Sequence, residues 1–151
     1  MSSGQVRTAR EPIGVGVIGC GSVSRVYIPH LQSLNVPRPR VDIRLVADLD
    51  PGRRPVVAER YALDCFTTDP AEVVGAPDIE LVLVLTAMPA HFALAKAALL
   101  AGKHVLVEKP FAMDADQSRE LVAAAKAEAS RRSARKLPGS VRVRVDPQVI
   151  D

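Results

Sequence analysis

The sequence predicts an α/β fold, a Rossmann-type doubly wound parallel sheet, and three observations support this prediction. Apolar runs of strand length alternate with helical patterns at intervals of roughly 25 to 30 residues, as in right-handed β-α-β units. The run Ile79 to Leu85 consists of Ile, Val and Leu apart from Glu80, which is typical of a central parallel strand buried on both faces. A glycine-rich turn, Gly19-Cys20-Gly21, separates the first apolar run from the first helical pattern.

The first strand, Ile13 to Ile18, leads directly into this turn. Glycine at Gly19 permits the turn, and glycine at Gly21 lets the backbone approach a phosphate, while the helix that follows supplies N–H groups and a positive dipole end. The small residues Ser22 and Ser24 come next, so the pattern is G-x-G-x-x-S. Alone, it predicts either a pyrophosphate cradle or a plain strand-to-helix turn.

The first helix and second strand follow. Helical spacing of Val23, Tyr27, Leu31 and Leu34 predicts a helix that faces the sheet, with a kink or an irregular turn at Pro29. The second strand is predicted over Val41 to Ala47.

An acidic side chain, Asp48, ends the second strand 24 residues after Ser24. A carboxylate there accepts both ribose hydroxyls of an adenosine and repels a 2′-phosphate. Alternatively, Asp48 and Asp50 both cap the next helix. Because Arg53 and Arg54 would accommodate a 2′-phosphate, the sequence favours NAD but leaves NADP open.

The remaining elements are predicted from apolar runs, prolines and capping residues. The first are a helix over Val56 to Tyr61, delayed by Pro55, and a short strand at Cys65–Phe66. A helix capped by Asp69, with Pro70 and Glu72, then ends at Gly75, and a helix over His91 to Ala101 ends at Gly102. The last two are a strand over Val105 to Val107 and a helix that is capped by Asp114 and Gln117 and ends near Ser130.

In an open parallel sheet a ligand lies outside the carboxyl ends of the strands. This rule brings four segments together: Gly19–Ser24, Asp48, Thr86–His91 and Glu108–Pro110. Lys109 is the amine among them; it would hydrogen-bond a substrate hydroxyl, or it is simply a solvated surface lysine. For His91 the sequence alone favours a packing role.

Composition restricts the class of protein. The chain has 151 residues, the size of one domain. Up to Ala125 it has 13 Lys and Arg against 14 Asp and Glu, and after it 7 against 3, so the net charge of +3 comes from the end of the chain. Without interleaved aromatic residues, these basic residues do not favour nucleic-acid binding. The basic residues concerned are Arg131, Arg132, Arg135, Lys136, Arg142 and Arg144.

Two isolated cysteines and three scattered histidines form no metal-binding spacing. The first twelve residues are polar, and the longest apolar run, Leu81 to Leu85, is too short to cross a bilayer. These features predict a reduced, cytoplasmic protein without a structural metal or a membrane partner.

Three motifs resemble the Gfo/Idh/MocA oxidoreductases (glucose–fructose oxidoreductase, inositol 2-dehydrogenase and relatives). They are VGVIGCGSVS, VADLDP and LVLVLTAMPAHFALAKAALLAGKHVLVEKPFA, and the similarity extends from Ile13 to Ala129. The resemblance implies a nicotinamide dinucleotide cofactor, with Lys109 as the catalytic residue and the bond before Pro110 often cis. The cofactor-binding residues implied by motif and resemblance together are Gly19, Gly21, Ser22, Val23, Asp48, Thr86, His91, Glu108, Lys109 and Pro110.

The chain departs from the family in two ways. Ala87 replaces the proline usual after the family's threonine, and the chain is about half as long as family members, whose second domain contacts substrate. We therefore predict a polar tail over 1–12, an NAD(P)-binding Rossmann domain over 13–130 and, over 131–151, a basic tail or an edge strand formed by the alternating residues Val141 to Val145.

Two functions follow from this organisation. The first is a nicotinamide-dependent oxidoreductase that acts on a sugar, polyol or related hydroxyl substrate. The alternative is a catalytically incomplete NAD(P)-binding module or truncated paralogue. An uncovered cofactor cleft also predicts marginal stability or self-association.

Overall fold

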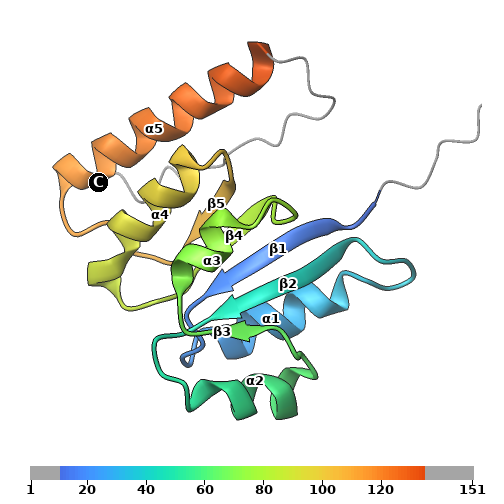
Figure 1. Cartoon of the computed structure of the whole chain (residues 1–151). Coiled ribbons are helices and arrows are strands. Elements are labelled where there is room, and N and C mark those ends of the chain that lie inside the picture. The colour runs from blue at the N-terminus through green and yellow to red at the C-terminus, as the bar shows by residue number, and fades with distance from the viewer. Residues whose placement is uncertain (1–10, 135–151) are drawn as a thin grey trace, which may run out of the picture.

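A computed structural model describes residues 11–134, which form a five-stranded parallel sheet in the order β3-β2-β1-β4-β5 (Figure 1). This order, with helices on both faces, confirms the doubly wound Rossmann-type prediction. The strands are β1 (Ile13–Ile18), β2 (Val41–Ala47), β3 (Phe66–Thr67), β4 (Leu81–Val84) and β5 (His104–Val107).

Helices cover both faces of the sheet. One face is covered by α1 (Ser24–Ser33) and α2 (Arg53–Tyr61), and the other by α3 (Pro70–Gly75) and α4 (His91–Leu100). A short 3₁₀ turn, η1 (Met88–Ala90), precedes α4, and the long helix α5 (Ala115–Ala134) packs on α4 beyond the edge of the sheet (Figure 1). Within residues 11–134, no helix combines the length and apolarity needed to cross a bilayer.

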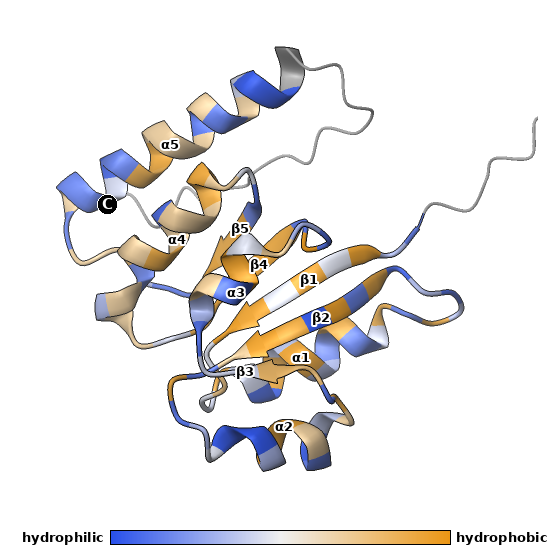
Figure 2. Cartoon of the chain, viewed as in Figure 1, coloured by the Kyte–Doolittle hydropathy of each residue, from blue (hydrophilic) through white to orange (hydrophobic). Residues whose placement is uncertain are grey.

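Side chains of the central strands alternate between two apolar clusters. Val15, Val17 and Leu83 pack toward α1 and α2, whereas Val82 and Val84 pack toward α3 and α4. Since both faces are covered, the central strands are apolar throughout, and Figure 2 shows them as mainly hydrophobic while α2 and both ends of α5 carry many hydrophilic residues.

Two helix caps confirm their predictions. The Asp69 side chain accepts a hydrogen bond from the Ala71 N–H at 2.9 Å, with Pro70 at the first helical position. The predicted part of Glu72 in this cap was wrong, because the Asp69 N–H donates to Thr67 Oγ1 instead. At the start of α5 the caps are reciprocal: Asp114 Oδ1 accepts from the Gln117 N–H at 2.8 Å, and Gln117 Oε1 accepts from the Met113 N–H at 3.1 Å.

Several predicted boundaries were wrong. Helix α2 begins at Arg53 rather than Val56, because Pro55 falls in the first turn, where backbone N–H groups have no intrahelical partner. In α1 the predicted residue Leu31 is buried, but so is Ile28, which was not predicted, while Leu34 is the C-cap and is 38% exposed. Helix α5 continues to Ala134, beyond the predicted end at Ser130.

Other predictions are refined or untested. Pro29 lies inside α1, which continues through it as one helix. The third strand is shifted by one residue, to Phe66–Thr67. The predicted edge strand at 141–145 lies outside the described residues, as does most of the predicted polar tail.

Candidate functional site

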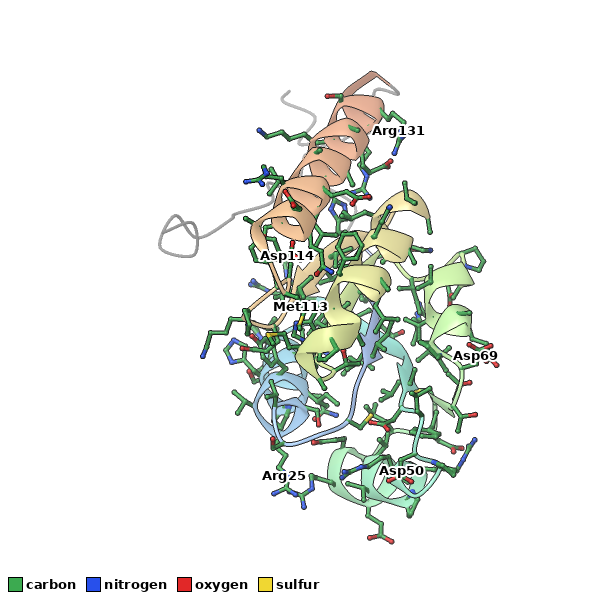
Figure 3. The ribbon with its side chains drawn as sticks, turned by 90° about the vertical axis from the view of Figure 1, so that its left-hand side faces the viewer. Arg25, Asp50, Asp69, Met113, Asp114 and Arg131 are labelled. Atoms are coloured by element: carbon green, nitrogen blue, oxygen red, sulfur yellow. The ribbon has the colours of Figure 1, made fainter. Side chains whose placement is uncertain are left out.

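The segments that follow the five strands meet at the carboxyl edge of the sheet. Figure 3 faces this edge, and its labels mark the segments that follow four of the strands: Arg25 after β1, Asp50 after β2, Asp69 after β3, and Met113 and Asp114 after β5. Only Arg131, at the far end of α5, lies away from the edge. The predicted strand-end neighbourhood is therefore a single region of the structure.

Gly19 makes the sharp turn that ends β1. Its φ is +102°, in the region where side chains are strained, and a Cβ there would lie 2.7 Å from the Leu85 carbonyl carbon. Its N–H donates to the Ala47 carbonyl at 2.7 Å, which joins the turn to the end of β2. Only glycine fits at this position.

Gly21 has a different environment. A Cβ built on it meets no atom within 4 Å, so the backbone here faces open space. The N–H groups of Gly21, Ser22 and Val23 donate no hydrogen bond to residues 11–134, and they precede the positive end of the α1 dipole. These donors and this space suit an anionic group.

Ser24 explains the serine in the G-x-G-x-x-S pattern. Its side chain is fully buried, and its Oγ donates to the Gly21 carbonyl at 2.7 Å. The Tyr61 hydroxyl of α2 lies 3.2 Å from the same Oγ. A small hydroxyl therefore fits where α1 meets α2 and ties the helix start to the turn.

Asp48 connects the end of β2 to the glycine turn. Its Oδ2 accepts from the Cys20 N–H at 2.7 Å, and its Oδ1 accepts from the Asp50 N–H at 3.0 Å. Asp50 instead accepts from the N–H of Gly52, the N-cap of α2, at 2.9 Å. The alternative in which both acids cap α2 was wrong, because the N-cap is Gly52 and no side chain caps this helix. Asp50 shapes the chain just before α2, and Asp48 is held against the glycine turn.

The two arginines after Asp50 have partners of their own. Arg53 pairs with Asp50 at 3.6 Å. Arg54 donates to the Phe66 carbonyl at 3.3 Å, and its guanidinium lies 5.1 Å from the centre of the Phe66 ring. Both guanidinium groups are already engaged within the protein.

A cleft of about 500 Å³ lies between these loops. Of the predicted site residues, Gly19, Gly21, Asp48 and Thr86 line it. Its other walls are mainly apolar: Ile18, Ala47, Leu49, Pro70, Leu85, Ala87, Ala90, Ala93 and Leu94. None of these was predicted as a cofactor-binding residue, although Ala87 and Ala90 lie within the predicted segment Thr86–His91. One feature of the sequence could have indicated Leu49 as part of a binding site, because it is a large apolar residue between two acids. In the structure its side chain is 79% exposed.

Ala87, where the family has proline, keeps the backbone of this loop compatible with proline. Its φ is −66° and its ψ is 146°. Because proline fixes φ near −65°, Ala87 has the backbone conformation that a proline would impose at this position.

The predicted residues Ser22, Val23, His91, Glu108, Lys109 and Pro110 do not line the cleft. The last three follow β5, where the Lys109–Pro110 bond is cis and Lys109 is exposed. Glu108 is half-buried and accepts a hydrogen bond from the Tyr27 hydroxyl at 2.8 Å. This contact was not predicted, because it joins residues 81 positions apart.

His91 lies behind the site. Only 1% of it is exposed, and its ring spans two loops: Nδ1 lies 2.8 Å from the Pro110 carbonyl oxygen and Nε2 lies 2.8 Å from that of Thr86. A ring nitrogen that carries a proton donates to its carbonyl. His91 thus fixes the loop after β4 relative to the loop after β5.

Cys20, between the two glycines, is unsuited to nucleophilic chemistry. Burial, followed by the negative charge of Asp48, raises the pKa of its thiol to about 12, against a smaller opposing effect of Arg53. At neutral pH the residue is a neutral thiol, and the nucleophile is the thiolate.

Comparison with known proteins agrees with this geometry. The family described as "Oxidoreductase family, NAD-binding Rossmann fold" (GFO_IDH_MocA) matches residues 13–134. The chain belongs to the Gfo/Idh/MocA oxidoreductase family. The oxidoreductase YdgJ of Escherichia coli, described as uncharacterized, is 35% identical over 77% of this chain and 32% of its own length. Inositol 2-dehydrogenase of Acidothermus cellulolyticus is 34% identical over 79% of the chain and 34% of its own length.

Solved structures of family members are similar as well. GenD2 from gentamicin A biosynthesis, in complex with NAD, is 33% identical with a TM-score of 0.70 over 79% of this chain and 33% of its own. Levoglucosan dehydrogenase with NADH and levoglucosan is 28% identical with a TM-score of 0.72 over the same shares. The 3-ketoreductase KijD10 of Actinomadura kijaniata, with TDP-benzene and NADP, is 31% identical with a TM-score of 0.68 over 79% and 36%.

This chain spans about a third of the length of these Gfo/Idh/MocA relatives. The matched part is the NAD-binding Rossmann fold, so the comparisons concern this region of each relative. A nicotinamide dinucleotide is accordingly the cofactor class of the family.

Proposed function

We propose that this chain is the cofactor-binding domain of a nicotinamide-dependent oxidoreductase that acts on a sugar, polyol or related hydroxyl-bearing substrate. One observation carries the proposal: the open backbone at Gly21 and the carboxylate of Asp48 line the same cleft, joined through the 2.7 Å bond from the Cys20 N–H. A phosphate-binding turn beside a ribose-binding acid is the arrangement that a dinucleotide requires.

The pyrophosphate is proposed to lie over Gly21, Ser22 and Val23. Their N–H groups make no hydrogen bond within residues 11–134, and the α1 dipole favours negative charge there. A side chain at Gly21 would occupy the space that a phosphate needs.

The adenosine is proposed to lie between Asp48 and the apolar wall of the cleft. Asp48 has both oxygens oriented by backbone N–H groups and would accept the ribose hydroxyls, while Leu49 and Pro70 would cover the adenine. Arg53 and Arg54 are engaged by Asp50 and Phe66, so they offer little to a 2′-phosphate. These contacts favour NAD over NADP.

The nicotinamide is proposed to lie toward Thr86, Glu108 and Lys109. When bound, it would accept or donate a hydride, and the residues of this chain would bind and move protons around it. Glu108 would accept a hydrogen bond from the nicotinamide ribose, and the exposed amine of Lys109 would hydrogen-bond the substrate hydroxyl and assist its deprotonation. His91 and Pro110 would hold the two loops around it.

Hydroxylated substrates are proposed from the relatives. Family members similar to this chain include inositol 2-dehydrogenase and levoglucosan dehydrogenase, both of which are named for polyhydroxylated compounds.

Turnover tests the proposal. The chain is assayed with NAD⁺ against a panel of inositols, other polyols and aldoses, by absorbance of the reduced nicotinamide. Lys109→Ala should lower kcat by about 10²- to 10⁴-fold, the range of general acid–base catalysis. The exposed Lys126→Ala is the matched control and should retain the activity of the unmodified chain.

Two other outcomes would contradict it. Equal activity of Lys109→Ala and Lys126→Ala would remove Lys109 from catalysis. Saturable NADH binding without turnover across the panel would favour the catalytically incomplete binding module.

A further inference from the structure

Glu108 projects from the edge strand toward the α1 face of the sheet. The preceding alternate residues of β5, Val105 and Val107, pack toward α3, α4 and α5. Since successive side chains of a strand point to opposite faces, Glu108 points the other way. There its Oε2 meets the hydroxyl of Tyr27, which comes from the start of α1.

The chemistry of the contact gives the two groups defined roles. Burial, together with the hydrogen bond and negative charge of Glu108, raises the pKa of the Tyr27 phenol, so the phenol keeps its proton and donates. Glu108 Oε2 accepts at 2.8 Å, and Glu108 Oε1 has no hydrogen-bond partner among residues 11–134. One oxygen is therefore anchored, and the other is available to a ligand.

Tyr27 also connects the two ends of the site. It lies three residues after Ser24, whose Oγ holds the carbonyl of Gly21. The first turn of α1 thus makes two contacts: Ser24 holds the proposed phosphate-binding turn, and Tyr27 holds the carboxylate of Glu108. Without the hydroxyl, the Glu108 carboxylate would have no hydrogen bond to a side chain of residues 11–134.

We propose that Tyr27 is a positioning residue for the nicotinamide half of the cofactor: it holds Glu108 so that the free carboxylate oxygen accepts a hydroxyl of the nicotinamide ribose. The inference rests on the proposed function, since it assumes that the cleft binds a nicotinamide dinucleotide. It assigns to Tyr27 an effect on NADH and none on a ligand that lacks the second ribose, such as ADP.

The test compares NADH and ADP on the full 151-residue chain by isothermal titration calorimetry. Tyr27→Phe keeps the ring and removes the hydroxyl. It should weaken NADH binding about 5- to 10-fold, the net contribution of one hydrogen bond, because Glu108 loses the contact that orients it, and leave the Kd of ADP within about 2-fold. Tyr61→Phe is the matched control, because it also removes one tyrosine hydroxyl but one that contacts Ser24 rather than Glu108. Since Ser24 holds the turn that both ligands share, any change in Tyr61→Phe should alter the Kd of NADH and of ADP by the same factor.

The double-mutant cycle with Glu108→Ala is the second readout. If Tyr27 acts through Glu108, Tyr27→Phe should cause no further loss of NADH affinity once Glu108 is alanine. A purely structural role would instead weaken NADH and ADP alike in both backgrounds.

The outcomes separate this inference from the proposed function. An unmodified, folded chain that binds neither NADH nor ADP overturns the proposed function and the inference with it. An unmodified chain that binds both, with Tyr27→Phe changing neither Kd or both by the same factor, overturns the inference alone.

Discussion

Gly21→Val separates the folding role of the glycine turn from its binding role. A Cβ at Gly21 meets no atom within 4 Å, and the residue does not have a positive φ. The variant should therefore fold, with a free energy of unfolding within about 0.5 kcal/mol of the unmodified chain, as for other surface substitutions. Its added methyl groups would fill the space above the N–H groups of Ser22 and Val23.

The expected loss of binding follows from those donors. Each hydrogen bond to a charged group contributes about 1.5–3 kcal/mol, so blocking two of them costs at least about 3 kcal/mol. Since 1.4 kcal/mol corresponds to about a factor of ten, the Kd for NADH should rise on the order of 100-fold. Calorimetry measures this Kd, and urea denaturation measures the stability.

Two glycine variants complete the experiment. Gly75→Val also places its side chain in open space, at the distant end of α3, and should bind NADH as the unmodified chain does. Gly19→Val should fail to fold, because its φ is +102° and its Cβ would lie 2.7 Å from the backbone of Leu85. A Gly21→Val chain that binds NADH with unchanged Kd would refute the phosphate-binding role of the turn.

Two further predictions concern stability. Burial, followed by the charge of Arg132, lowers the pKa of His104 below its ordinary value of 6.5, so the unfolded chain binds the proton more readily. The free energy of unfolding should therefore fall as the pH drops below about 6.5, and His104→Gln should flatten this part of the profile; an unchanged slope in that variant would contradict it. Asp69→Ala removes the N-cap bond to Ala71 and should destabilise the chain by about 1 kcal/mol in urea denaturation, whereas an unchanged midpoint would contradict the cap.

The parts of the structure that depend on local sequence were predictable. The alternation of strands and helices follows from apolar periodicity, and the caps at Asp69 and Asp114 follow from residues three or fewer positions apart. The placement of Gly19 and Asp48 at one cleft could be predicted because each follows one of two successive parallel strands, whose carboxyl ends meet at the same edge of the sheet.

The parts that depend on tertiary packing were not predictable from the residues. The Tyr27–Glu108 bond joins segments 81 positions apart and requires the strand order in space. The double contact of His91 requires the relative placement of two loops. The apolar wall of the cleft combines residues of five segments, and their approach to one another requires the packing of helices on the sheet. The start of α2 at Arg53 was missed because the first turn of a helix tolerates proline. The end of α5 at Ala134 was missed because helix ends are not sharply defined by the sequence.

Titration of the folded 151-residue chain with NADH, followed by calorimetry, tests the central claim most directly. The cleft formed by Gly21 and Asp48 predicts saturable binding of one NADH per chain, weakened on the order of 100-fold in Asp48→Ala, since that variant loses hydrogen bonds from both ribose hydroxyls to a charged carboxylate. A chain whose circular dichroism shows it to be folded, yet which binds no NADH at concentrations up to about 1 mM, would contradict the account.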